Sequence, residues 1–139
     1  MKIEIKLRIA AADGSICDEE ILRFDKPHDQ LEAIGLSLAE AKDLLGRLQE
    51  HIVAAQAATF AAERRCCQQC GRAQTSKGST SIRFRTPFGD VPVSSPRLHR
   101  CACDAGQTRT FSPLTTLFSE HVAPELLYLE TKWASLVSF

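Results

Sequence analysis

Two close pairs of cysteines constrain this chain more than any other feature of its sequence. Cys67 and Cys70 are separated by two residues and are followed by Gly71, and Cys101 and Cys103 form a second pair farther along. Structural zinc prefers four thiolate ligands at about 2.3 Å, and a Cys-x-x-Cys turn offers two thiols together with backbone N–H groups. Gly71 suits the positive φ that such a turn often needs. The sequence therefore predicts one structural Zn²⁺ bound by these four cysteines.

Other uses of the same cysteines stay open at the level of sequence. Two disulfides could form, but no signal peptide is visible and we expect a cytoplasmic protein, in which disulfides are rare. A redox Cys-x-x-Cys normally opens a helix after a strand, whereas this pair follows a predicted helix and precedes predicted strands. Iron is accepted by rubredoxin-like four-thiolate sites. Zinc is the better prediction because it is more available.

Four further residues compete for a place in the site. Cys66 would leave a three-residue gap to Cys70, whereas Cys67 gives the standard two. Cys17 lies in a predicted strand and is most simply a small buried apolar residue. His99 and His121 could replace a thiol, but four cysteines already complete a tetrahedral shell. We therefore place none of these four in the site.

Length and charge bound the remaining possibilities. A chain of 139 residues with 44% hydrophobic content makes one domain or two very small ones. No apolar run is long enough to span a membrane. The net charge is zero, but residues 66–111 carry seven Lys and Arg against two Asp and Glu. Four thiolates around Zn²⁺ would return two negative charges, so the excess of five falls to three. The cysteine module is the basic part, which suggests a polyanionic partner.

Residues 1–65 predict a β-hairpin and a long helix, and we expect an α+β fold. Residues 2–10 alternate between apolar and charged side chains, as in a half-buried strand. Asp13-Gly14 supplies a turn before a less regular returning strand. Ser37 and Glu40 have the spacing of a capping box, after which a helix should run to about Arg65.

The long helix carries a weak heptad pattern, which leaves two interpretations open. A dimerising coiled coil through residues 38–65 would make the chain a homodimer. An amphipathic helix packed on its own domain explains the same pattern, because barely three heptads are present and the later positions are alanines. The apolar residues concerned are Leu38, Leu45, Leu48, Ile52, Ala55 and Ala62.

Residues 66–111 predict a zinc ribbon, in which two cysteine turns are joined by antiparallel strands. Ile82 and Phe84 alternate with basic residues, Pro87 to Asp90 make a turn, and Pro92 and Pro96 interrupt the return strand. So small a sheet needs the metal for much of its folding free energy. A basic face on the ribbon suits phosphate contact, although a merely solvated face is the alternative. The candidate DNA-binding residues are Arg72, Lys77, Arg83, Arg85, Arg97 and Arg100.

Residues 112–139 predict helical structure. Ser112 or Pro113 starts a short helix through Phe118, and Pro124 opens a strongly apolar final helix. The sequence stops at Phe139 without a terminating signal. We therefore expect the front part of something longer, or a helix that docks on a partner.

Ordered sequence blocks over nearly the whole chain resemble the N-terminal region of a bacterial insertion-sequence transposase family, the ISKra type. Together these blocks are far more specific than either cysteine pair alone. They comprise the runs at 36–42, 67–71, 82–89, 95–98, 101–103, 111–114 and 123–136.

The resemblance implies a DNA transposase in which this region recognises DNA or mediates assembly and a later DDE domain transfers strands. The chain departs from that pattern because no acidic triad is present. Glu120, Glu125 and Glu130 are spaced at five-residue steps and do not converge on one helix face. Gln68 also stands where the first cysteine turn of the family would have proline. The sequence shows neither a nucleophile paired with a base nor an open metal position, so nothing in it indicates an enzyme.

Two hypotheses follow. The first is a catalytically inactive, zinc-dependent DNA-binding or assembly module, truncated or domesticated from a transposase, cytoplasmic and nucleoid-associated when bound to DNA. The second is an interaction protein, whose long and terminal helices bind a partner such as the full-length transposase as a dominant-negative subunit.

Overall fold

The computed structural model describes residues 1–11, 14–103 and 109–137, and it confirms the α+β class. Two compact units are formed, Met1–His51 and Ile52–Phe139. The helix α1 (Leu38–Glu63) begins in the first unit and ends in the second. The parts expected as ribbon and terminal segment, 66–111 and 112–139, both fall in the second unit. No helix in the described residues is long and apolar enough to cross a membrane.

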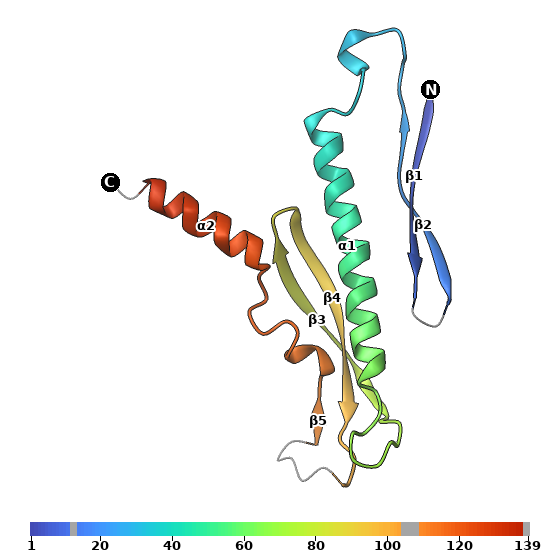
Figure 1. The fold of residues 1–139 in the computed structure, drawn as a ribbon, viewed down its shortest axis with the longest axis vertical. Coiled ribbons are helices and arrows are strands. Elements are labelled where there is room, and N and C mark those ends of the chain that lie inside the picture. The colour runs from blue at the N-terminus through green and yellow to red at the C-terminus, as the bar shows by residue number, and fades with distance from the viewer. Residues whose placement is uncertain (12–13, 104–108, 138–139) are drawn as a thin grey trace. The chain divides into compact units, whose positions relative to one another are not determined.

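The first unit opens with the predicted hairpin, β1 (Lys2–Ala10) and β2 (Ile16–Asp25), paired antiparallel (Figure 1). Every second residue of β1 is half-buried, as its alternation predicts. Gly14 has a φ of 84°, which suits the predicted turn, while Asp13 lies outside the described residues. Ile21 and Phe24 are the buried side chains of this unit, so its apolar core is small.

The capping box at the start of α1 is confirmed. The Glu40 backbone N–H donates to Ser37 Oγ at 3.2 Å, and the Ser37 N–H donates to Glu40 Oε2 at 2.7 Å. Lys26 Nζ also reaches Glu40 Oε2, at 2.6 Å. A 3₁₀ turn at Leu31–Ala33 lies between the hairpin and α1. The cap therefore fixes the helix start and ties it to the end of β2.

The second unit is built on a three-stranded antiparallel sheet in the order β3 (Ser76–Thr86), β4 (Gly89–His99), β5 (Thr110–Phe111). Thr86 pairs with Gly89 across the predicted turn. Contrary to our expectation, β4 runs through Pro92 and Pro96 without interruption. Pro92 and Pro96 are four residues apart, so their backbone nitrogens face the same edge of β4. On the edge toward β5, only Leu98 and His99 are paired, so no neighbouring strand needs an N–H donor from either proline.

The core of this unit forms where the later turns of α1 pack on the sheet. Its buried residues come from α1, β4 and the segment after β5, which contains the 3₁₀ turn Pro113–Thr115. Phe84 is partly buried against this core and packs edge-on against Phe118 with ring centroids 4.9 Å apart. We expected a short helix through Phe118, but only the 3₁₀ turn Pro113–Thr115 forms there. The buried members are Val53, Ala57, Val91, Val93, Leu114 and Phe118.

The face that α1 buries differs from the heptad pattern. Val53 and Ala57 are buried, and Phe60 and Ala61 pack against them. Two residues of the expected seam, Leu45 and Ile52, are 41% and 36% exposed. Within the second unit, α1 therefore buries the face that carries Val53 and Ala57. The homodimer through residues 38–65 stays a prediction.

The helix α2 (Pro124–Val137) begins at the predicted proline but buries none of its residues within the described structure. The segment before it pairs with the outer edge of β3: the Arg85 N–H donates to the His121 carbonyl at 2.9 Å, and the Ala123 N–H donates to the Arg85 carbonyl at 2.8 Å. Trp133 and Leu136 are 66% and 65% exposed. Phe139, the last residue of the sequence, lies outside the described residues.

Candidate metal centre

The four predicted ligand residues meet in one cluster. The sulfur atoms of Cys67, Cys70, Cys101 and Cys103 all lie within 4.8 Å of one another. Cys67 Sγ is 3.3 Å from Cys103 Sγ, and Cys70 Sγ is 3.5 Å from Cys101 Sγ. Metal–sulfur bonds of about 2.3 Å in a tetrahedron place sulfurs about 3.8 Å apart. The cluster therefore has the size of a four-thiolate metal site.

The first cysteine turn is shaped by backbone hydrogen bonds as α1 ends. The Gly71 N–H donates to the Cys67 carbonyl, and the Cys67 N–H donates to the Arg72 carbonyl, both at 2.9 Å. Gly71 has a φ of 69°, the left-handed conformation predicted for it. The Gln74 N–H closes the loop by donating to the Arg65 carbonyl at 2.9 Å. These bonds turn both thiols of the pair to the same side.

The second pair follows directly from the end of β4. The His99 N–H donates to the Thr75 carbonyl at 2.9 Å, which links this pair to the base of the first turn. The Arg100 N–H donates to the Arg109 carbonyl at 3.0 Å, and β5 continues the pairing. The β3–β4 pairing, through its last members, thus brings the two cysteine pairs together from distant positions in the sequence.

Hydrogen bonds within the cluster shift the pKa of three of its four thiols. The backbone N–H groups of Cys70 and Gln69 donate to the Cys67 sulfur and lower the pKa of that thiol to about 6. The Cys103 N–H likewise lowers the pKa of Cys101. Hydrogen bonding with the Cys101 and Cys67 sulfurs raises the pKa of Cys103 well above its usual range. Four neighbouring thiolates need positive charge between them, which a divalent metal supplies.

The donor set fits a metal better than the alternatives. All six cysteines are free, and the 3.3 Å between the Cys67 and Cys103 sulfurs is far longer than a disulfide bond of about 2.05 Å. The Cys-x-x-Cys pair follows a helix and precedes a strand, which is the reverse of the redox arrangement. These four residues can therefore hold a metal ion, and their thiol chemistry suits zinc or iron.

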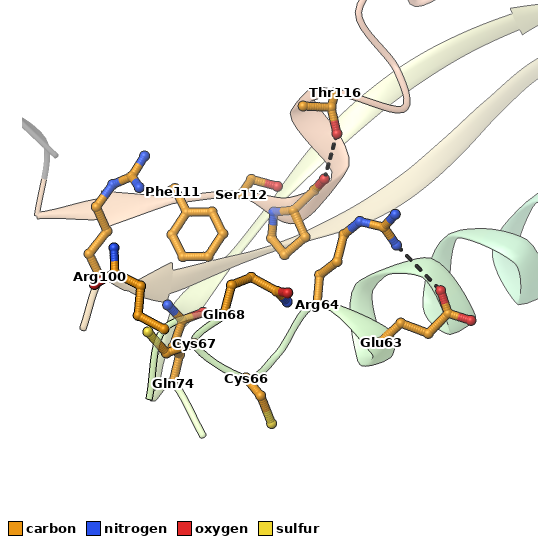
Figure 2. Close-up of a pocket in the computed structure, with 12 residues that line it drawn as sticks. Glu63, Arg64, Cys66, Cys67, Gln68, Gln74, Arg100, Phe111, Ser112 and Thr116 are labelled. Atoms are coloured by element: carbon orange, nitrogen blue, oxygen red, sulfur yellow. Dashed lines mark hydrogen bonds and ion pairs between the residues drawn. The ribbon is translucent and has the colours of Figure 1, made fainter. Parts of the chain in front are cut away.

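The competing residues lie outside the cluster. Cys66 is exposed, and Figure 2 shows its sulfur directed away from that of Cys67. Neither His99 nor His121 joins the four cysteines. Our prediction that Cys17 is buried is wrong: it is exposed, because it pairs with Ile9 near the turn end of the hairpin, where β2 is exposed from Ile16 to Glu20.

The predicted DNA-binding residues divide into two groups, and the first is already paired with acids or polar groups. Arg83 Nε donates to Asp90 Oδ2 at 2.6 Å, and Arg85 Nη2 donates to Glu130 Oε1 at 2.5 Å. Arg97 Nη2 donates to Thr110 Oγ1 at 3.3 Å. Arg83 and Arg85 do share the face opposite Ile82 and Phe84, as alternation predicts. Their charges are nevertheless partly neutralised by carboxylates.

The second group lies near the cysteines. Arg72 and Lys77 are exposed and have no ion pair within the described residues. The Arg100 guanidinium is over the Phe111 ring, 5.0 Å from its centroid. The six predicted DNA-binding residues therefore do not form one face of equally exposed, unpaired charges.

A cavity of about 680 Å³ beside the first cysteine turn was not predicted (Figure 2). Cys67 lines it, together with Gln68, Gln74, Arg100 and Phe111. The only hint in the sequence is the run of glutamines around the first cysteine pair. The cavity itself depends on Phe111, which lies far along the chain and is brought there by β5.

Comparison of this chain with protein-family models, with curated proteins and with solved structures finds no match. The cysteine cluster is therefore the feature from which a function has to be argued.

Proposed function

We propose that this chain is a catalytically inactive, zinc-stabilised module that binds DNA or mediates assembly, derived from the N-terminal region of a transposase. The observation that carries the proposal is the cluster of Cys67, Cys70, Cys101 and Cys103, with all sulfurs within 4.8 Å. Zinc bound there joins the end of α1 to the end of β4, and so holds a small sheet whose core is modest.

DNA contact is supported by the charge around the metal centre. Arg72 and Lys77 extend from the first turn and the start of β3, and both are exposed. Phosphate contacts need exposed cations of this kind, whereas Arg83 and Arg85 must first give up or share their carboxylate partners. We therefore expect the first phosphate contacts at the end of the sheet that lies next to the cysteine turns.

The metal is tested by elemental analysis of the purified full chain. We expect about one zinc per chain, lost in Cys67→Ser and in Cys101→Ser. Cys66→Ser is the matched control because it changes a neighbouring thiol outside the cluster, and it should keep the zinc. A metal-free but folded wild-type chain would contradict the proposal.

DNA binding is tested by titrating a duplex of transposon-end sequence at several salt concentrations. Affinity should fall with rising salt, and a double variant Arg72→Gln, Lys77→Gln should lower both the affinity and the salt slope. The same change at Lys42 and Arg47, on the exposed face of α1, is the control for net charge. Affinity that is undetectable at low salt, or indifferent to salt, would exclude direct DNA binding.

A second candidate is an interaction protein that does not touch DNA. The observation in its favour is α2, whose large apolar side chains Tyr128, Trp133 and Leu136 are each more than 60% exposed. Soluble chains seldom leave several such side chains exposed on one helix unless a partner covers them. Light scattering across a concentration series, with and without full-length transposase, tests this candidate. A monomer at every concentration that ignores the transposase would remove it.

A further inference from the structure

The cavity beside the first cysteine turn has the features of a ligand site. Its volume of about 680 Å³ lies within the range of small-molecule sites in proteins, about 300–1,000 Å³. The end of α1, the first turn, the end of β4 and the β5 segment all contribute to its wall. Four segments that converge on one hollow give it a defined shape.

An amide group in the wall lacks a partner. Gln74 Oε1 is buried and accepts no hydrogen bond within the described residues. A buried acceptor without a donor costs free energy, so a turn of the Gln74 side chain that lets a ligand group donate to Oε1 would be favourable. Gln68 and Gln69 bring two further amides to the same wall. Amides that both donate and accept match the edges of nucleobases.

An aromatic ring and two guanidinium groups complete the lining. Phe111 is half-buried, with the Arg100 guanidinium 5.0 Å from its ring centroid. Figure 2 shows Arg100 and Phe111 at one side of the cavity and Arg64 at the other, where Arg64 Nη1 is 3.3 Å from Glu63 Oε2. Aromatic rings stack on bases, and guanidinium groups bind phosphate.

We propose that this cavity receives one unpaired nucleotide of a DNA strand. Its base packs against Phe111 and donates to Gln74 Oε1 once that side chain turns into the cavity, and its phosphates lie toward Arg64 and Arg100. This inference rests on the proposed DNA-binding function and names the part of the DNA that the site recognises.

The structure separates this site from the duplex contacts. Arg72 and Lys77, which we assign to duplex phosphates, do not line the cavity, and neither do Arg83 and Arg85. The two kinds of contact can therefore be altered independently. A duplex with a single-stranded extension can use both, whereas a blunt duplex uses only the first.

Fluorescence anisotropy with the zinc-loaded full chain tests the proposal on three labelled DNAs of the same duplex. One is blunt, one carries a short adenine extension, and one carries an extension of the same length made of abasic sites. We expect the adenine extension to tighten binding about tenfold over the blunt end, from the stacking of one base. The abasic extension keeps the phosphates but should give little of this gain.

Variants locate the effect in the cavity. Phe111→Leu and Gln74→Met should each remove most of the gain from the adenine extension while leaving the affinity for blunt duplex unchanged. Phe88→Leu and Gln56→Met are matched controls, since Phe88 is exposed at the β3–β4 turn and Gln56 is exposed on α1, and neither lines the cavity. Zinc content and thermal melting verify that each variant is folded. Because the abasic arm alters only the DNA, it tests the proposal even where a variant fails to fold.

The outcomes distinguish the two proposals. Equal affinity for the adenine and abasic extensions, together with salt-dependent duplex binding, would overturn the nucleotide site and leave the proposed function standing. Binding to a free adenine strand but not to blunt duplex would support the nucleotide site and overturn the duplex contacts. No binding to any of the three DNAs or to the free strand would overturn both. A gain that survives in both cavity variants, folded, would also overturn the site.

Discussion

The two hairpins of this chain are similar in length but are stabilised in different ways. β1–β2 buries only Ile21 and Phe24, and cross-strand ion pairs line its exposed face, among them Arg8 with Asp18 and Arg23 with Glu4. β3–β4 buries a row of β4 side chains under α1 and ends at the cysteine cluster. An alternating pattern predicts a hairpin in both places, but what covers the apolar face decides its stability.

The energetic consequence is a difference in robustness. Burial of an aliphatic side chain contributes roughly 1.5–3 kcal/mol, whereas an exposed ion pair contributes at most about 1 kcal/mol. A structural metal adds more than either, because it links segments that are far apart in sequence. The second unit should therefore depend on a few decisive residues, and the first on many weak ones.

The largest expected effect is the removal of the metal. A strong chelator, or Cys101→Ser, should unfold the second unit, because four thiols without a cation no longer hold the two cysteine turns together. Hydrogen exchange resolved along the chain should show protection lost in β3 and β4 but kept in β1 and β2. Cys17→Ser, which changes an exposed thiol in the first unit, should alter neither. Equal loss in both units would mean that they unfold together and would remove the contrast.

The second effect concerns the core of the same unit. Leu114 is fully buried between β4 and α1 residues, so Leu114→Ala should lower the free energy of unfolding by about 2–5 kcal/mol. Leu117→Ala, three residues on and 45% exposed, should change it by less than about 0.5 kcal/mol. Urea unfolding of the zinc-loaded chain measures both. Similar values for the two variants would show that this segment is not packed as described.

The third effect is the pH dependence of the first unit. The hydrogen bond from Lys26, followed by that from the Ser37 N–H, lowers the Glu40 pKa from 4.5 to about 2. A lowered pKa in the folded state means that Glu40 stabilises the unit fully above pH 4.5 and loses this contribution as the pH falls toward 2. Glu40→Gln keeps an amide for the cap but removes the charge.

Thermal melting followed by NMR at the β1–β2 amides tests this prediction. The midpoint of Glu40→Gln should lie below that of the wild type at pH 7, and the difference should shrink progressively below pH 4.5. Asp43→Asn, whose carboxylate pairs with Arg47 on the exposed face of α1, serves as a charge-matched control. A difference that is independent of pH would contradict the assigned ion pair.

The smallest effect is expected for a single ion pair on the first hairpin. Arg8 and Asp18 are joined by two hydrogen bonds of 2.8 and 2.9 Å, but their side chains are 71% and 48% exposed. Solvent screening and the entropy of long side chains should cancel most of the attraction. Arg8→Gln should therefore leave the melting midpoint of β1–β2 unchanged within error. A double-mutant cycle with Asp18→Asn measures the pair itself, and a clear coupling would show that the ion pairs carry more of this hairpin than we argue.

Local chemistry made part of this structure predictable. The four candidate ligand cysteines follow from spacing, because each close pair can offer two thiols to one ion and two such pairs complete a tetrahedral shell. Ser37 and Glu40 predict the start of α1, and Pro124 that of α2, since each satisfies helix ends through neighbours a few residues away. Alternation placed Ile82 and Phe84 on the core side of β3. Each helix start, each strand pattern and each cysteine pair is decided within one turn or one strand.

The remaining features depend on partners distant in sequence. The heptad spacing favoured the face of Leu45 and Ile52, but the sheet lies against Val53 and Ala57, because packing across elements selects the buried face. The polar stretch from Ser76 gives no strand signal, yet it pairs with the end of β4. Arg85 was predicted for phosphate but meets Glu130, 45 residues away.

The sequence by itself determined the two cysteine pairs, the helix starts and the alternation of the strands, because each of these rests on residues only a few positions apart. Only the tertiary structure decided which helix face is buried, which arginines keep an exposed charge, and that Gln74 and Phe111 share a cavity beside the cysteines. Such features arise where segments from four parts of the chain meet. Their geometry depends on side-chain packing, which the order of residues in any one segment does not encode.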